Sequence, residues 1–303
     1  MTSSNFLERV ILYGTRHGWF NWVPDKIYLK VVYRIRMKKS LDFRNPQTFN
    51  EKMQWLKVNN RRDIYTTLVD KYSVRAYIKN MIGEKYLIPL LGEVWNRVED
   101  IDFDSLPNQF VLKTTHDSGG VVICTDKSKF DRDKAIKKLK LSLGHDYYGE
   151  SREWPYKNVK KRIIAETFMK DTENEELKDF KFYCFNGVPT YCHVIGSRQT
   201  NETMDFYDME WNLMPFTKMK NMFEEFPHDT SNTTPPDKLK EMISIAKKLS
   251  KGFPFVRIDL YQINNKVYFG EITFFPNSGF GKFSPESWDS KIGEQINLSQ
   301  EDK

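Results

Sequence analysis

The chain has 303 residues and a modest net charge of +6, because 47 Lys and Arg stand against 41 Asp and Glu. This length allows a large core, while the lack of any run of eighteen apolar residues argues against a membrane-spanning helix, and no apolar signal stretch opens the sequence. The three cysteines, Cys124, Cys184 and Cys192, have no CxxC spacing, which argues against a disulfide framework or a zinc site and predicts a cytoplasmic protein whose cysteines lie in the core.

Residues 19–39 form the first segment with a clear pattern. Trp19 and Trp22 precede a stretch in which cations alternate with apolar side chains, and these cations are Lys26, Lys30, Arg34, Arg36, Lys38 and Lys39. One interpretation is a basic amphipathic helix on an anionic membrane, which would put the protein at the inner face of the membrane. The other is a helix that docks on the core and keeps its basic face in water, which is the commoner arrangement.

Helical patterns continue from about residue 40 to 96. Thr48 followed by Glu51 matches a capping box, and Asp70 predicts the start of a later helix that Gly83 closes. The pattern then changes to the two-residue period of strands, with predicted strands at 109–113, 121–124, 163–166, 179–185, 190–194, 256–260 and 267–272. Helices are predicted at 131–143 and 236–249. Strands and helices mixed without a regular βαβ rhythm indicate the α+β class.

Lys113 lies at the end of a predicted strand, beside a loop that contains Ser118, Gly119 and Gly120. Glycine backbone can approach a phosphate closely and turn its N–H groups toward it, and a nearby lysine supplies positive charge. A plain hairpin turn is the alternative. Lys181 and Asp179 share one face of a predicted strand. Lys181 is therefore either a second candidate phosphate ligand or part of a face turned to water.

Asp259 and Glu271 lie on two predicted strands that a turn at Asn264 and Asn265 connects. Antiparallel pairing would bring the two carboxylates to one face. Facing carboxylates repel each other unless a cation or a proton lies between them, and paired hard oxygen ligands are typical of Mg²⁺ sites at nucleotides. The alternative is an ordinary hairpin with acidic residues on its solvated face.

Taken in order, these segments resemble the ATP-grasp superfamily, and most closely the TupA-like ATP-grasp family of teichuronopeptide and capsular-polysaccharide gene clusters. The resemblance covers roughly residues 45–290, and many dispersed matches make it more specific than any single motif. The matching segments are TFNEK at 48–52 with Trp55, Asp70-Lys71, LPNQFVLK at 106–113, REW at 152–154, DFKFYCFNG at 179–187 and GEIT at 270–273.

This resemblance implies an ATP-grasp fold in which two α+β lobes clamp ATP. The corresponding segments are an N-terminal helical extension at 1–45, a helical segment at 46–105, a first lobe at 106–165 and a second lobe with the metal site at 166–297. Arg257 and Lys181 are the implied catalytic residues, and Asp259, Glu271 and Thr273 the implied Mg²⁺ ligands. The implied ATP-binding residues are Arg75, Lys113, Ser118, Gly119, Gly120, Ala165, Glu166 and Phe168, with Ala165, Glu166 and Phe168 as the adenine hinge.

Two of these positions depart from the family pattern. Arg75 stands where related ligases carry the first phosphate-binding lysine, so the charge is kept but a planar fork replaces a point charge. Thr273 stands where most ATP-grasp enzymes have a metal-binding Asn, which leaves Asn277 as an alternative ligand. Mg²⁺ tolerates a weak neutral ligand when carboxylates and phosphates dominate its shell.

The implied reaction joins a carboxylate to an amine through an acyl phosphate, with ATP and Mg²⁺ as cofactors. The expected substrates are a uronic acid of a surface polysaccharide or its lipid-linked precursor and an amino acid or small amine, and no nucleic acid is expected. Arg152 and Arg198 are candidate substrate contacts, while His116 is either a lid contact or an exposed loop residue. Two other classes stay open, a glycosyltransferase that uses Asp131 and Asp133 as a DxD motif and a non-catalytic polysaccharide- or membrane-binding module.

Overall fold

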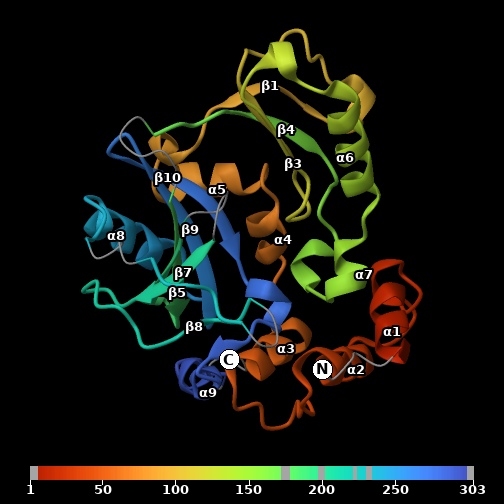
Figure 1. Cartoon of the computed structure of the whole chain (residues 1–303), viewed down its shortest axis with the longest axis vertical. Coiled ribbons are helices and arrows are strands. Elements are labelled where there is room, and N and C mark those ends of the chain that lie inside the picture. Colours follow the sequence, from red (N-terminus) through yellow and green to blue (C-terminus); the bar gives the residue numbers. More distant parts are fainter. Residues whose placement is uncertain (1–5, 172–177, 197–201, 221–223, 230–233, 299–303) are drawn as a thin grey trace. The chain divides into compact units, whose positions relative to one another are not determined.

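A computed structural model of the chain (Figure 1) describes residues 6–171, 178–196, 202–220, 224–229 and 234–298. The chain divides into two compact units, a larger unit made of Met1–Arg61 and Asp171–Lys303 and a smaller unit made of Arg62–Lys170. The segment predicted at 46–105 is therefore shared between the units. The predicted boundary at 165/166 lies close to the junction at 170/171.

The smaller unit contains a four-stranded antiparallel sheet in the order β1-β4-β2-β3. Its strands are β1 (Leu90–Trp95), β2 (Phe110–Thr114), β3 (Val121–Cys124) and β4 (Ile163–Thr167). Its helices are α4 (Ile64–Val69), α5 (Val74–Met81), α6 (Arg132–Gly144) and α7 (Tyr147–Ser151), with 3₁₀ turns η1 (Glu84–Tyr86), η2 (Val98–Asp100), η3 (Lys127–Lys129) and η4 (Trp154–Tyr156). The two-residue period of β2 buries Phe110 and Leu112 beneath α6, where they pack with Leu139.

The larger unit contains a five-stranded antiparallel sheet in the order β10-β9-β5-β6-β7 and a small sheet of β8 and β11. Its strands are β5 (Asp179–Phe185), β6 (Val188–Gly196), β7 (Thr203–Tyr207), β8 (Thr217–Lys218), β9 (Phe255–Ile263), β10 (Lys266–Thr273) and β11 (Phe283–Ser284). Its helices are α1 (Phe6–Arg16), α2 (Asp25–Met37), α3 (Phe49–Asn59), α8 (Leu239–Leu249) and α9 (Ser287–Glu294), with the 3₁₀ turn η5 (Pro276–Gly279).

The five-stranded sheet has one apolar and one polar face. On β5 and β9 the apolar side chains alternate with the polar ones, and Phe182 and Ile258 are fully buried on the apolar face. Helix α8 (Figure 1) packs against β5, β6 and β9. It contributes the buried Met242 and Leu249. The opposite face carries every predicted catalytic and metal-binding residue of this unit.

Most of the predicted elements are present. The capping box at the start of α3 is confirmed. The Thr48 hydroxyl accepts a hydrogen bond from the Glu51 N–H, and the Glu51 carboxylate accepts one from the Thr48 N–H. Helix α5 begins at Val74, a few residues later than predicted. The reason is that the Asp70 carboxylate accepts the N–H groups of Tyr72 and Ser73 and holds this stretch as a turn.

The basic segment forms α2, which docks on the core as the second interpretation predicted. Tyr28, Leu29 and Tyr33 are buried on one side of the helix, whereas Lys26 and Lys30 are exposed on the other. No helix among the described residues is long and apolar enough to cross a bilayer.

Candidate active site

Strand registers bring Lys181, Arg257 and Asp259 together on the polar face of the five-stranded sheet. Lys181 lies directly opposite Asp259, and Tyr183 lies directly opposite Arg257. Residues that face each other across an antiparallel pair project to the same side. The DFK and RID segments of the sequence are therefore adjacent parts of one surface.

Glu271 reaches the same face only because β10 contains a bulge. The turn at Asn264 and Asn265 has φ angles of 49° and 58°, and it pairs Phe269 with Leu260. An unbroken ladder would next pair Gly270 with Asp259 and turn Glu271 to the apolar face. The register shifts at this point, so Glu271 pairs with Asp259 and Thr273 with Arg257.

Arg257 lies at the centre of the resulting ion-pair network. Its Nε donates to Asp259 Oδ1 at 2.6 Å, and its Nη2 donates to Asp259 Oδ2 at 2.7 Å and to Glu271 Oε1 at 2.8 Å. The Thr273 hydroxyl accepts from the same Nη2 at 3.0 Å and donates to Glu271 Oε1 at 3.0 Å. This fork-shaped contact fixes the direction of the Asp259 carboxylate.

Lys181 completes the network from the neighbouring strand. Its Nζ contacts Asp259 Oδ2 at 2.5 Å and Asp179 Oδ2 at 2.8 Å. Burial alone would lower the pKa of Lys181, but Asp259 outweighs burial and raises the pKa. Burial would likewise lower the pKa of Arg257, which Asp259 and Glu271 hold above its ordinary value. Both cations are therefore charged at any physiological pH.

The acids of this network differ in exposure, and that difference bears on metal binding. The Asp259 side chain is 1% exposed, whereas the Glu271 side chain is 40% exposed. Two carboxylates and the Thr273 hydroxyl form a set of hard oxygen donors that suits Mg²⁺. Within the described ranges, no group of three or more His, Cys, Asp or Glu forms a closed metal cage. The donor set therefore fits a metal whose shell is completed by substrate oxygens.

Asn277 has a different partner in the structure. Its Oδ1 accepts a hydrogen bond from Lys218 Nζ at 2.8 Å. Sequence reasoning missed Lys218, because it lies on a two-residue strand with no recognisable motif. Burial, followed by the charges of Arg257 and Lys181, lowers the pKa of Lys218 to about 7, while Asp259 acts in the opposite direction. Lys218 also lies over the ring of Tyr183, the residue directly opposite Arg257, so it borders the network.

The smaller unit carries its own ion-pair cluster, formed by Lys113, Glu166 and Arg75. Lys113 Nζ contacts Glu166 Oε2 at 2.6 Å, and Arg75 Nη1 contacts Glu166 Oε1 at 3.3 Å. Arg75 also donates to the carbonyl of Ile88 at 2.8 Å. The register of β2 with β4 puts Lys113 and Glu166 diagonally across one face. The sequence did not indicate that a predicted hinge residue binds the predicted phosphate lysine.

Ala165 and Phe168, the other two predicted hinge residues, differ in exposure. Ala165 is buried within β4, and Phe168 follows the end of that strand and is half-buried. A hollow of about 720 Å³ lies nearby within the same unit, and it is lined by Tyr72, Ser73, Arg75, Ala76, Lys79, Glu84, Lys85, Leu87, Pro89 and Leu90. The assignment of an adenine site to this stretch stays a prediction.

The glycine loop between β2 and β3 is held by the Asp117 carboxylate. This carboxylate accepts from the hydroxyls of Thr114 and Ser142 and from the N–H of Gly120 at 3.2 Å. A Cβ on Gly120 would collide with the Thr114 and Ser142 side chains, so glycine is required there for packing. Ser118 and Gly119 are the exposed part of the loop.

Two predicted polar residues, His116 and Arg152, have environments that the sequence did not indicate. His116 is 3% exposed and its Nε2 lies 3.1 Å from the carbonyl of Ser142, so the expectation of an exposed loop residue is wrong. Arg152 is also buried, with its guanidinium over the ring of Tyr148 at 5.6 Å from the centroid. Arg198 lies outside the described residues.

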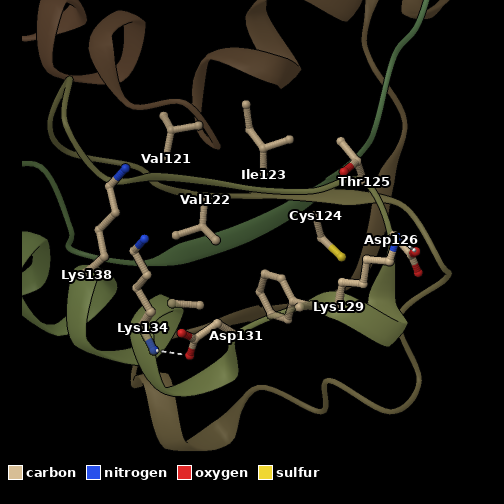
Figure 2. Close-up of a pocket in the computed structure, with 12 residues that line it drawn as sticks. Val121, Val122, Ile123, Cys124, Thr125, Asp126, Lys129, Asp131, Lys134 and Lys138 are labelled. Carbon is tan, nitrogen blue, oxygen red and sulfur yellow. Dashed lines mark hydrogen bonds and ion pairs between the residues drawn. The ribbon is translucent and has the colours of Figure 1, made fainter.

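The Asp131–Asp133 pair has a structural explanation. Asp131 is the N-cap of α6, where its Oδ1 accepts from the Lys134 N–H at 2.9 Å. Figure 2 shows it at one side of a hollow of about 480 Å³ between β3 and α6, with Lys134 and Lys138 projecting from the helix. An acidic residue engaged as a helix cap is poorly placed to bind a metal-bound sugar nucleotide. All three cysteines are buried and reduced, as predicted.

A model of the family described as TupA-like ATPgrasp matches residues 51–297. No curated protein gave a significant match.

Several solved ligases are similar to the chain. The D-alanine–D-alanine ligase from Bacillus anthracis complexed with ATP is 16% identical, with a TM-score of 0.43, over 76% of this chain and 65% of that chain. The L-amino acid ligase from Bacillus licheniformis is 14% identical, with a TM-score of 0.42, over 85% and 57%. The ATP-grasp ligase PsnB complexed with minimal precursor, Mg and ADP is 10% identical, with a TM-score of 0.35, over 74% and 57%. The chain spans less than two thirds of the length of each of these ligases.

Proposed function

Because the chain belongs to the TupA-like ATP-grasp family, whose model matches residues 51–297, we propose that it is an ATP- and Mg²⁺-dependent ligase that joins a carboxylate to an amine. The observation that carries this proposal is the network of Arg257, Asp259, Glu271 and Lys181. It combines cations that can bind a transferred phosphoryl group with oxygen donors that can hold a divalent metal. Phosphoryl transfer needs this positioning and charge neutralisation, and it needs little covalent help from the protein.

Each residue of the network has a role in the proposed reaction. Asp259 and Glu271, with the hydroxyl of Thr273, would hold Mg²⁺, and the metal would neutralise charge on the phosphate oxygens. Arg257 and Lys181 bind the phosphoryl group as it moves to the substrate carboxylate. The amine then attacks the acyl phosphate, and an amide, ADP and phosphate are released. No nucleophilic Ser or Cys is needed, which agrees with the burial of all three cysteines.

Lys113 and Arg75 of the smaller unit are the proposed phosphate-binding residues of ATP. Two cations share one carboxylate there, so the cluster keeps a net positive charge. Exposed Ser118 and Gly119 follow Lys113 in the chain and offer backbone N–H groups. The proposed substrates are a uronic acid of a surface polysaccharide or its lipid-linked precursor and an amino acid or small amine, in keeping with the family's gene clusters.

The direct test is product formation. The purified protein is incubated with ATP, Mg²⁺ and a panel of uronic acids and amines, and ADP and product mass are measured. We expect ADP release that requires both organic substrates and a product whose mass equals their sum less one water. A parallel incubation with UDP-sugars tests the glycosyltransferase alternative. Sugar transfer without ATP consumption would overturn the proposal.

We also propose that the protein contacts an anionic membrane through α1, α2 and their connection. Seven of the fourteen large hydrophobic side chains that the described residues expose lie there, namely Phe6, Leu7, Tyr13, Trp19, Trp22, Ile27 and Val31. Trp22 is 82% exposed and donates to the carbonyl of Trp19 at 3.1 Å. Lys26, Lys30 and Arg34 lie on the exposed side of α2 beside Ile27 and Val31. Exposed aromatics flanked by cations suit an anionic lipid surface.

A further inference from the structure

Lys218 has an unusual environment for a lysine. It is 5% exposed, and its ammonium lies over the rings of Tyr183 and Phe283, at 5.7 Å and 5.6 Å from the centroids. Its hydrogen-bond partner is the neutral Oδ1 of Asn277. An ammonium has three N–H donors, so one neutral acceptor leaves much of its hydrogen-bonding capacity for another group.

The charge around Lys218 is also unbalanced. Lys181 and Arg257 each contact at least one carboxylate, and Lys113 in the other unit contacts Glu166. Among the residues that the structure describes, no carboxylate forms an ion pair with Lys218. Burying an ammonium without a counter-ion is unfavourable, so the fold alone gives no reason to place a lysine here.

The partner of Lys218 is held in a fixed position. Asn277 and Ser278 both adopt left-handed backbone, with φ of 50° and 54°, which costs energy unless neighbouring groups impose it. Lys57 donates to the carbonyl of Ser278 at 2.9 Å, and Gln54 donates to the carbonyl of Gly279 at 2.7 Å. The turn therefore presents the Asn277 amide to Lys218 in one orientation.

We propose that Lys218 binds an oxyanion of the reacting substrates, either the carboxylate of the acyl donor or the phosphoryl group that it receives. This inference rests on the proposed function, since it assigns the missing counter-ion of Lys218 to the ligand. Arg257 is paired with Asp259 and Glu271 and Lys181 with Asp179 and Asp259, whereas Lys218 has hydrogen-bond donors available for a further anion. Asn277 then orients the ammonium and is a positioning residue.

The test compares Lys218→Met and Lys218→Arg with the wild type. Lys220→Met is the matched control, because it removes an exposed lysine two residues away. Thermal shift and isothermal titration measure binding of three probes, the non-hydrolysable nucleotide AMPPNP with Mg²⁺, D-glucuronate alone and inorganic phosphate alone. If the carboxylate is the ligand, Lys218→Met weakens glucuronate binding at least tenfold and spares the nucleotide. If the phosphoryl group is the ligand, phosphate and nucleotide binding fall instead, and in either case the arginine variant keeps part of the affinity.

Stability without ligand separates this role from a structural one. We expect Lys218→Met to melt at the same or a higher temperature, because it removes a buried charge that lacks a counter-ion. A lower melting temperature together with unchanged affinity for all three probes would overturn the inference and make Lys218 a structural residue. If the proposed function is wrong, the wild type does not bind Mg²⁺-AMPPNP. Binding of phosphate or glucuronate that depends on Lys218 would still support the inference, so the two failures are distinguishable.

Discussion

The two ion-pair clusters are built alike and differ in charge. Both lie on one face of an antiparallel sheet, and in both a cation and a carboxylate come from neighbouring strands. In the smaller unit two cations, Arg75 and Lys113, surround one carboxylate, Glu166, for a net charge of +1. In the larger unit two cations, Lys181 and Arg257, meet three carboxylates, those of Asp179, Asp259 and Glu271, for a net charge of −1.

Because their net charges differ in sign, the two clusters suit different ligands. An excess of positive charge suits phosphate oxygens, whereas an excess of carboxylates suits a divalent cation. The clusters also differ in burial, because Lys113 is 25% exposed in its side chain and Asp259 only 1%. We therefore expect substitutions in the smaller unit to affect binding, and substitutions in the larger unit to affect turnover and, where burial is complete, stability.

Asp259→Asn should have the largest effect. It should lower metal-dependent ATP turnover about a thousandfold, which corresponds to an increase of about 4 kcal/mol in the activation free energy. It should also destabilise the fold by about 3 kcal/mol or more, because Arg257 and Lys181 stay buried with fewer partners. ADP release and urea unfolding measure the two effects, with Asp237→Asn as a surface control. A fully stable, active variant would show that Asp259 is neither a metal ligand nor a counter-ion.

Glu271→Gln should cost turnover to a similar degree and leave stability nearly unchanged. The Glu271 side chain is 40% exposed, and Arg257 keeps both of its hydrogen bonds to Asp259 when the Glu271 charge is lost. This outcome would sharpen the distinction between the two acids of one site. Equal losses of stability in Glu271→Gln and Asp259→Asn would contradict it.

Stability should depend on pH through Lys218. The pKa of Lys218 is about 7 in the folded protein and 10.5 in its ordinary state, so between these values the unfolded chain binds more protons. Stability of the ligand-free protein should therefore rise as pH increases from 7 to 9, by about 1.4 kcal/mol per pH unit for one full proton. Lys218→Met should remove this rise. Identical pH profiles of the two proteins would show that Lys218 titrates normally.

Lys113→Met should weaken nucleotide binding by about tenfold to thirtyfold, because it removes one charge-assisted contact. This corresponds to a loss of about 2 kcal/mol of binding free energy. Wild-type protein should gain about 2.7 kcal/mol of stability at a nucleotide concentration one hundred times the dissociation constant. Thermal shift with Mg²⁺-ATP at millimolar concentration measures both. Lys129→Met removes another lysine of the same unit and should change nothing. No response of the wild type would count against the proposed function itself.

The smallest effect concerns the proposed membrane surface, which shares no residue with either cluster. Replacing Trp19 and Trp22 together with Ala should reduce sedimentation with vesicles of phosphatidylcholine and phosphatidylglycerol severalfold at low salt. Each exposed cation contributes about 1 kcal/mol at an anionic surface, so Lys26→Gln should weaken binding further. Leu141→Ala removes an equally exposed apolar side chain from the other unit and is the control. If the wild type ignores such vesicles, the membrane proposal is wrong.

Much of the site was predictable because short-range patterns determine it. The turn at Asn264 and Asn265 predicted the hairpin, and strand alternation predicted that Lys181 shares a face with Asp179. Other features depend on long-range packing. The bulge at Gly270 decides which face Glu271 occupies, and the glycine inside the strand is the one local signal of it.

Two further features were not predictable for the same reason. Lys218 is placed by pairing of β8 with β11, across more than sixty residues of chain. Arg257 lies between the two carboxylates and is the cation that such a pair requires, but the sequence did not show that one side chain contacts both. The partner of Lys218 is distant in the sequence, and the contact of Arg257 with Glu271 depends on the register of β10, so no local pattern records either feature.

The turn at Asn277 and Ser278 has a consequence for how the protein is made. Its conformation depends on Gln54 and Lys57, which lie more than two hundred residues earlier in the chain. The turn cannot take its final form until the C-terminal part has been synthesised and has packed on a helix that left the ribosome long before. Until then Gln54 and Lys57 of α3 stay exposed to water, and a chain truncated before this turn leaves α3 open to chaperones and proteases.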